Sequence, residues 1–200
     1  YGKADTVNFI NNKIKIDASY QDKLYTIFCH NSHADNGNNI NVVNNEFETI
    51  NQSSLYTISN TGEEFSFKNN TITTDKIYRV FDSKSIYEDN IINATNIANT
   101  VYHNVKSTKN NYINCKYLNV VFEFYNLNIT DDILIEDHIV TEEISANFMM
   151  FNGTDIYFNN HKVTFNNFIF ETKKIDAKYY YLAYGTNAIK DQGIINFNNS

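Results

Sequence analysis

The chain of 200 residues is 42% hydrophobic, which is enough for one domain with a buried core. Its formal net charge is −7 and its lysines are interspersed with acidic residues, which excludes the clustered basic surface of a nucleic-acid-binding protein. It contains no apolar run long enough to cross a membrane, and its acidic, tyrosine-rich composition is typical of an extracellular or secreted domain.

A short alternation of apolar and polar residues recurs along the first 80 residues and predicts short strands. Residues 7–9 and 14–16 alternate in this way on either side of Asn11 and Asn12, and residues 65–67 do so before Asn69 and Asn70. Asparagine tolerates the left-handed backbone region and bonds to its own main chain, so such pairs make tight corners. We therefore expect short strands joined by Asn corners.

One segment departs from this alternation and predicts an amphipathic helix over residues 86–106. Ser85 and Glu88 match a capping box at its start. Apolar residues then follow spacings of four and three, at positions 87, 91, 94, 98, 101 and 105. Because Asn is a poor helix former, we expect the helix to dock its apolar stripe along the sheet or over one end of it, where it would cover open strand edges.

The second half of the chain returns to short apolar steps separated by polar connectors. From Leu127 to Ile144 the apolar residues come in doublets, as a narrow core requires. The unit Phe-Asn-Asn then occurs at 158–160, 165–167 and 197–199, and is interpreted as the end of a short strand followed by a corner. This spacing predicts successive short strands, each followed by a tight turn.

Two all-β architectures satisfy this pattern. The first is a parallel β-solenoid, or β-helix, in which each strand stacks on its equivalent one coil later and Asn residues align in ladders. The alternative is an antiparallel β-sandwich made of hairpins, which would normally contain more than the six Gly of this chain. The sequence favours a single β-solenoid domain over residues 1–200, with the helix at 86–106 docked against it.

The run GTDIYFNNHKVTFNNFIFETKKIDA, followed by GTNAIKDQGIINF, resembles the C-terminal coils of bacterial minor pilins and pilus-associated surface proteins. The resemblance is a pattern, mainly over residues 144–197, and Asn167 stands where that family commonly has Gly. It implies the extracellular β-solenoid head of a type IV pilus protein, with a structural or adhesive role and a hydrophobic assembly helix before it. A chain that starts with Tyr1 fits a fragment of such a longer precursor. The resemblance transfers no catalytic residue.

The densest group of metal-capable side chains lies at residues 29–35. Transition metals bind Cys, His and Asp, but the spacing between His30 and His33 is too short for a helical zinc motif, and no second ligand group follows. The stretch is interpreted as a solvated loop, in which His30, His33 and Asp35 are candidate metal ligands. No cofactor is expected.

Enzymatic activity is not predicted. The acidic residues at 131–132, 136–137 and 142–143 could bind calcium or form a glycosidase pair, but they interrupt Ile-rich strands and are interpreted as a solvated face. The single arginine, Arg79, lacks an evident partner carboxylate. Cys115 could approach His103 or His138 in space, but no nucleophile motif, phosphate-binding loop or C-x-x-C pair occurs. A secreted polysaccharide-active enzyme on a β-helix remains the alternative.

Two further groups are candidates for contacts. An aromatic cluster able to stack on sugar rings or anchor a protein partner is formed by Tyr179, Tyr180, Tyr181 and Tyr184. Cys29 and Cys115 permit one disulfide bond, and the alternative is two buried thiols.

The function expected from these observations is the exposed head of a minor pilin or a related surface appendage. Its expected partners are other pilin subunits and a host-surface, glycan or biofilm ligand, with neither nucleic acid nor a membrane among them. A stand-alone glycan-binding module is the third hypothesis.

Overall fold

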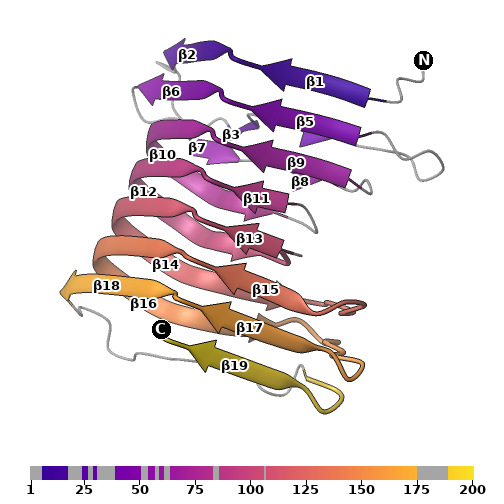
Figure 1. The fold of residues 1–200 in the computed structure, drawn as a ribbon. Coiled ribbons are helices and arrows are strands. Elements are labelled where there is room, and N and C mark those ends of the chain that lie inside the picture. Colours follow the sequence, from indigo (N-terminus) through magenta and orange to yellow (C-terminus); the bar gives the residue numbers. More distant parts are fainter. Residues whose placement is uncertain are drawn as a thin grey trace.

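The chain forms a parallel β-solenoid in the computed structural model (Figure 1). The structure describes residues 6–17, 24–26, 29–30, 39–50, 54–56, 59–60, 64–82, 86–105, 107–174 and 189–200. Every strand pair among these residues is parallel. This confirms the predicted β-solenoid and rules out the antiparallel β-sandwich.

The first sheet holds the strand that precedes the corner in each coil. In sheet order these strands are β1 (Thr6–Ile10), β5 (Asn39–Val43), β9 (Glu64–Lys68), β11 (Ile86–Glu88), β13 (Ser107–Lys109), β15 (Ile133–Glu136), β17 (Lys162–Asn166) and β19 (Ile194–Asn198). The order in the sheet is the order in the sequence, so each step across the sheet is one coil of the rod (Figure 1).

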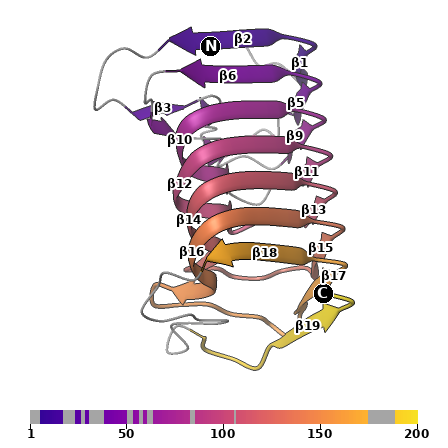
Figure 2. The same ribbon diagram turned by 90° about the vertical axis from the view of Figure 1, so that its left-hand side faces the viewer.

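The second sheet holds the strand that follows each corner. Its main path runs through β2 (Lys13–Asp17), β6 (Glu46–Ile50), β10 (Thr71–Asp82), β12 (Ile91–His103), β14 (Tyr112–Tyr125), β16 (Ile139–Asn152) and β18 (Ile169–Lys174). The long strands of this path curve round the rod (Figure 2). Short strands accompany the early coils: β7 (Ser54–Tyr56) pairs with β10 and with β3 (Leu24–Thr26), and β4 (Cys29–His30) pairs with β8 (Ser59–Asn60).

The core is a thin interior in which aromatic rings follow one another from coil to coil. Ring centroids lie 6.4 Å apart for Phe9 and Phe47, and 6.3 Å apart for Phe47 and Phe67. Further along, Tyr102 stacks on Phe122 at 4.7 Å. Each such pair contributes about 0.5–1.5 kcal/mol beyond the burial of its surface. The aromatic chain therefore ties neighbouring coils together as well as filling the space between the sheets.

The helix predicted over residues 86–106 is wrong, because this segment forms β11, a corner at Asp89 and Asn90, and β12. Between Ile97 and Thr100, β12 has one more residue than its neighbours β10 and β14, which is a β-bulge. Two members of the apparent helical stripe do not face the core: Ile91 is exposed and Ala98 is half-buried, whereas Ile92 and Ile97 are buried. The spacings of three and four therefore only imitate a helix. The segment forms strands because it pairs with strands on both sides and because Asn and β-branched residues have low helix propensity.

The described residues contain no helix with the length and apolarity needed to cross a bilayer.

Candidate functional site

Each first-sheet strand ends in a two-residue corner, and seven of the eight corners lead into a strand of the second sheet. The first corner residue has φ between 51° and 60° in all eight corners, and we call these residues the outer row: Asn11, Asn44, Asn69, Asp89, Asn110, Asp137, Asn167 and Asn199. Short polar side chains tolerate this left-handed conformation best after Gly. The backbone N–H at the corner donates to the next coil, as Asn11 does to the carbonyl of Val43 at 3.1 Å. The Asn-rich corners therefore have the backbone geometry that the sequence predicts.

The second corner residue forms the inner row, which runs through Asn12, Asn45, Asn70, Asn90, Asn111, His138, Phe168 and Ser200. The asparagines of this row make a continuous amide ladder. Asn70, for example, uses its backbone N–H and its side-chain Nδ2 to donate to Oδ1 of Asn90, at 3.0 and 3.3 Å, and Nδ2 also donates to the carbonyl of Val42 at 2.8 Å. The amides of Asn70, Asn90 and Asn111 are almost fully buried, and such satisfied buried groups specify one register between coils.

The amide ladder stops at His138, which is fully buried. Its Nδ1 is hydrogen-bonded to the hydroxyl of Tyr102 at 2.7 Å, and the two rings meet edge-on. Burial lowers the pKa of His138 from 6.5 to about 4 and raises the pKa of Tyr102 well above 10. Both side chains are therefore neutral at neutral pH, and they form a closed part of the core.

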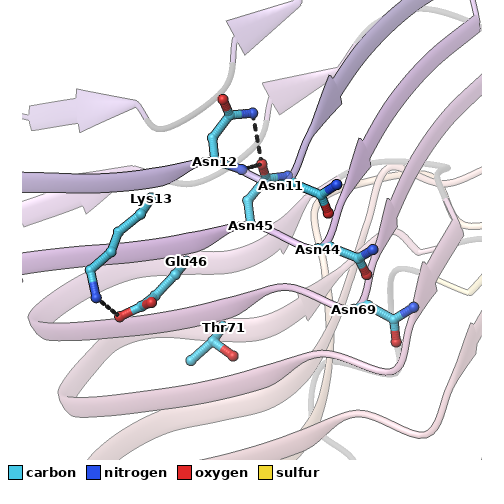
Figure 3. A pocket seen from close by; sticks show the side chains of 8 residues that line it. All are labelled: Asn11, Asn12, Lys13, Asn44, Asn45, Glu46, Asn69 and Thr71. Atoms are coloured by element: carbon cyan, nitrogen blue, oxygen red, sulfur yellow. Dashed lines mark hydrogen bonds and ion pairs between the residues drawn. The ribbon is translucent and has the colours of Figure 1, made fainter.

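A hollow of about 430 Å³ opens to solvent at the corners of the first three coils (Figure 3). It is lined by Asn11, Asn12, Lys13, Asn44, Asn45, Glu46, Asn69 and Thr71. The amides of Asn11, Asn44 and Asn69 stand one after another and point the same way (Figure 3). On the other side of the hollow, Nζ of Lys13 donates to Oε1 of Glu46 at 2.8 Å, and this bond raises the pKa of Lys13. The described residues that line the hollow are therefore polar and carry no net charge together.

The outer-row amides in the hollow differ from those further along the rod. Among the described residues, the side chains of Asn11, Asn44 and Asn69 make no hydrogen bond. In later coils the outer row pairs internally, with Nδ2 of Asn110 donating to Asp89 and Nδ2 of Asn167 donating to Asp137, both at 2.9 Å. Hydrogen-bonding capacity is thus left open where the hollow lies.

A third row follows the inner row and changes character along the rod. In register, this flanking row contains Lys13, Glu46, Thr71, Ile91, Tyr112, Ile139 and Ile169. Its last four side chains are 37–45% exposed. The polar hollow therefore continues along the same edge as an exposed apolar stripe over coils four to seven.

A second polar cluster is built from one side chain in each of four consecutive coils. Oε2 of Glu123 lies 3.7 Å from Nε2 of His103 and 3.9 Å from Nη2 of Arg79. Oε1 of Glu123 accepts a hydrogen bond from Nδ2 of Asn152 at 3.2 Å. Glu123 is 5% exposed and His103 is 7% exposed, so these two side chains are nearly closed to solvent, whereas Asn152 at the end of the cluster is exposed. A charge cluster of this kind is expensive to bury and depends on its partners for stability.

The expectation that Arg79 has no partner carboxylate is wrong. Arg79 and Glu123 belong to β10 and β14, two coils apart, and only the stacking of the coils brings them together. The sequence carries no local signal for this contact, although a single arginine in an Asn- and Lys-rich chain is itself a reason to look for one. Another contact that the sequence does not show is the pairing of His138 with Tyr102.

The acidic stretch around residue 132 is exposed and paired with basic side chains. Oδ1 of Asp132 lies 3.3 Å from Nδ1 of His161 and accepts a hydrogen bond from the backbone N–H of Lys162 at 3.1 Å, which lowers the pKa of the Asp132 carboxyl. Glu136 pairs with Lys109 at 3.3 Å. The described residues hold no group of three or more His, Cys, Asp or Glu side chains placed to bind a metal ion.

The remaining candidates fall largely outside the described residues. His33, Asp35 and the tyrosine cluster (Tyr179, Tyr180, Tyr181 and Tyr184) lie in segments that the structure does not describe, and of His30 and Cys29 it describes only the backbone, in β4. Cys115 is buried in β14, with Sγ 3.8 Å from the carbonyl oxygen of Thr141. The metal site, the aromatic contact surface and the disulfide bond stay predictions.

Comparison of the chain with protein-family models, with curated proteins and with solved structures gives no match.

Proposed function

We propose that this domain is a structural and adhesive rod on an extracellular surface. The observation that supports the proposal is the repetition of one corner through eight coils. The amide ladder holds the first five of these corners from inside, and the outer row and the flanking row repeat once per coil on the surface. In a solenoid each strand pairs with its equivalents in the neighbouring coils, so such a stack forms an elongated body with a continuous side surface. A rod of this kind holds binding groups at a fixed distance from its point of attachment.

The charged side chains on the outside favour a structural role over a catalytic one. They pair across neighbouring coils, in Lys13–Glu46, Lys15–Glu48, Lys68–Glu88, Lys109–Glu136 and Lys162–Asp132, at 2.7–3.5 Å. Exposed pairs contribute only about 0–1 kcal/mol each. Their regular placement instead favours the in-register stacking of coils, because a slip would set them out of line.

Surface display and adhesion can be tested in the cells that produce the protein. An epitope inserted after Asn160, in an exposed turn, should be detected on intact cells and should be removed by external protease. Deletion of the gene should lower attachment of the cells to a coated surface. Detection only after permeabilisation, or unchanged attachment, would contradict the proposal.

The narrower hypothesis, the head of a type IV minor pilin assembled with other pilin subunits, is kept as a prediction. It requires an apolar helix of about 20 residues directly before Tyr1 in the encoded protein. Sequencing of the gene upstream of this codon tests it, and a different kind of segment there would argue for another surface appendage.

The second candidate is a polysaccharide-active enzyme, because Arg79, His103 and Glu123 together provide a base, an acid and a positive charge. The near-complete burial of Glu123 and His103 argues against access by a polymer. Release of reducing ends from a panel of polysaccharides, abolished in Glu123→Gln, would establish the enzyme. We expect no release by either protein.

A further inference from the structure

We propose that the hollow at Asn11, Asn44 and Asn69 binds a neutral linear polysaccharide that lies along the rod across successive coils. The inference deepens the proposed function, since it names the ligand class of the adhesive surface, and its test is independent of where the protein resides.

The three outer-row amides of the hollow have hydrogen-bonding capacity that suits a sugar. A side-chain amide offers two donor hydrogens and one acceptor oxygen, and a sugar hydroxyl is itself both a donor and an acceptor. The three amides point the same way and are not used by any described residue (Figure 3). Their spacing is set by the strands to about 4.8 Å per coil. A linear glycan presents hydroxyls at regular steps along its length, so it can engage one amide after another.

The charge of the hollow and of the whole protein favours a neutral glycan over an anionic one. Among the described residues that line the hollow, the ionised side chains are those of Lys13 and Glu46, which are bonded to each other at 2.8 Å, so the ammonium is already neutralised. The protein as a whole carries a formal charge of −7. A polyuronate or a nucleic acid would meet repulsion and would find no free cation among the described residues of the hollow.

The path of the glycan is indicated by the flanking row. Beyond Thr71 this row becomes apolar, with Ile91, Tyr112 and Ile139 exposed one coil after another. The C–H faces of sugar rings pack on apolar and aromatic side chains, and Tyr112 provides an aromatic ring. A chain held by the amides and continued along this edge would therefore contact polar groups first and apolar groups after them.

Binding can be measured by calorimetry with defined oligosaccharides. The probes are hexamers of neutral sugars (cellohexaose, mannohexaose, xylohexaose and chitohexaose) and hexagalacturonate as the anionic comparison. We expect at least one neutral hexamer to bind and hexagalacturonate not to bind. In the triple variant Asn11→Gly, Asn44→Gly, Asn69→Gly the affinity should fall roughly tenfold to a hundredfold, as expected for the loss of two or three hydrogen bonds.

Glycine is chosen because it keeps the left-handed backbone without strain while removing the amide. The matched control is Asn160→Gly: Asn160 is also exposed, has φ of 64° and lies in a turn outside the hollow. It should bind like the parent protein, and the melting temperature of the triple variant should confirm that it is folded. A second variant, Tyr112→Ala, should weaken binding of a long polymer. It should not weaken binding of the shortest neutral oligosaccharide that the parent protein binds.

The inference is overturned if no neutral hexamer binds, if hexagalacturonate binds instead, or if the folded triple variant binds as tightly as the parent. A long polymer that binds Tyr112→Ala as tightly as it binds the parent protein would overturn the path along the rod. A protein that is displayed on the cell but binds no neutral glycan would keep the proposed function and lose this inference. A protein that binds the glycan but stays inside the cell would do the reverse.

Discussion

At the scale of single residues, the left-handed corner explains why asparagine is used where glycine is common in other folds. The outer row holds only Asn and Asp, and the described residues with positive φ are Asn and Asp apart from Gly153. Asparagine adds a side chain that the position can use, either to bond within the row or to face a ligand. Glycine would satisfy the backbone but would leave the corner without these groups.

The first residue-scale prediction concerns His138 and acid. Burial lowers its pKa from 6.5 to about 4, so between these values the unfolded chain binds a proton that the folded chain does not. Folding stability should therefore be complete above pH 6.5 and should decline as the pH falls towards 4, by about 3 kcal/mol in total. Urea unfolding at pH 7, 5.5 and 4.5 measures this decline.

The variant His138→Phe isolates that contribution, because Phe168 occupies the same inner-row position one coil later. Its stability should vary less between pH 6.5 and 4, although Tyr102 loses its hydrogen-bond partner and the stability at pH 7 falls. An unchanged slope in His138→Phe would show that other groups cause the acid sensitivity.

The second residue-scale prediction concerns Gly153, which has φ of 91°. A Cβ atom at this position would overlap Oδ1 of Asn126, the atom that accepts a hydrogen bond from the N–H of Thr154 at 2.7 Å. Gly153→Ala should lower the free energy of unfolding by about 1–3 kcal/mol, through backbone strain and the displaced amide. In the double variant with Asn126→Gly the obstructing amide is gone, so the two losses should be less than additive. Full additivity would exclude the clash.

At the scale of elements, the amide ladder makes the corner a unit shared between coils. Asn90 donates to the carbonyl of Phe67 at 3.0 Å and to Oδ1 of Asn111 at 2.8 Å, and it accepts from the N–H of Asn70 at 3.0 Å. Its removal therefore disturbs three coils, whereas Asn12 lies at the end of the ladder and is partly exposed.

We predict that Asn90→Ala costs about 1–3 kcal/mol, because buried groups lose their partners, and that Asn12→Ala costs less than about 1 kcal/mol. Asn90→Asp sets a carboxyl oxygen against the carbonyl of Phe67 and Oδ1 of Asn111 at a fully buried site, so it should cost at least as much as Asn90→Ala. Thermal and urea unfolding of the three variants provide the comparison. Equal losses at positions 12 and 90 would mean that the ladder does not act cooperatively.

The corners and the strand type could be predicted from the sequence because both are local. Paired asparagines between short alternating runs determine a left-handed turn, and the scarcity of glycine argued against hairpins. Residues 86–106 could not be assigned correctly, because the bulge between Ile97 and Thr100 is visible only against its neighbours in β10 and β14. Local periodicity does not reveal such a shift of register.

The sites depend on contacts between coils, and this limits what the sequence shows. The hollow combines three corners that are 33 and 25 residues apart along the inner row, and the cluster at Glu123 combines four coils. Coil lengths differ, so no fixed spacing announces which residues meet. The amides of the hollow could have been suspected as corner residues, but their alignment with Lys13 and Glu46 could not.

At the scale of the whole molecule, the strands should differ in how readily they open. β12, β14 and β16 are paired on both sides, whereas β1 and β2 each have one neighbouring strand within the described residues. Native-state hydrogen exchange should therefore be slowest in β12, β14 and β16 and fastest in the end strands β1, β2, β18 and β19, which each have one neighbour among the described residues. Opening of an end coil breaks one interface, and opening of a central coil breaks two. Uniform protection along the rod would instead indicate unfolding in a single step.

The corners keep one geometry although the segment between successive inner-row residues varies from 20 to 33 residues. The additional residues of the longer coils are thus placed away from the corners, and the corner geometry stays the same. A deletion or duplication that runs from one corner to the next removes or adds one whole coil. Each such event changes the length of the rod by about 4.8 Å and leaves the outer row of corner side chains in register. The length of the rod can therefore change between generations in steps of one coil without changing the corner geometry.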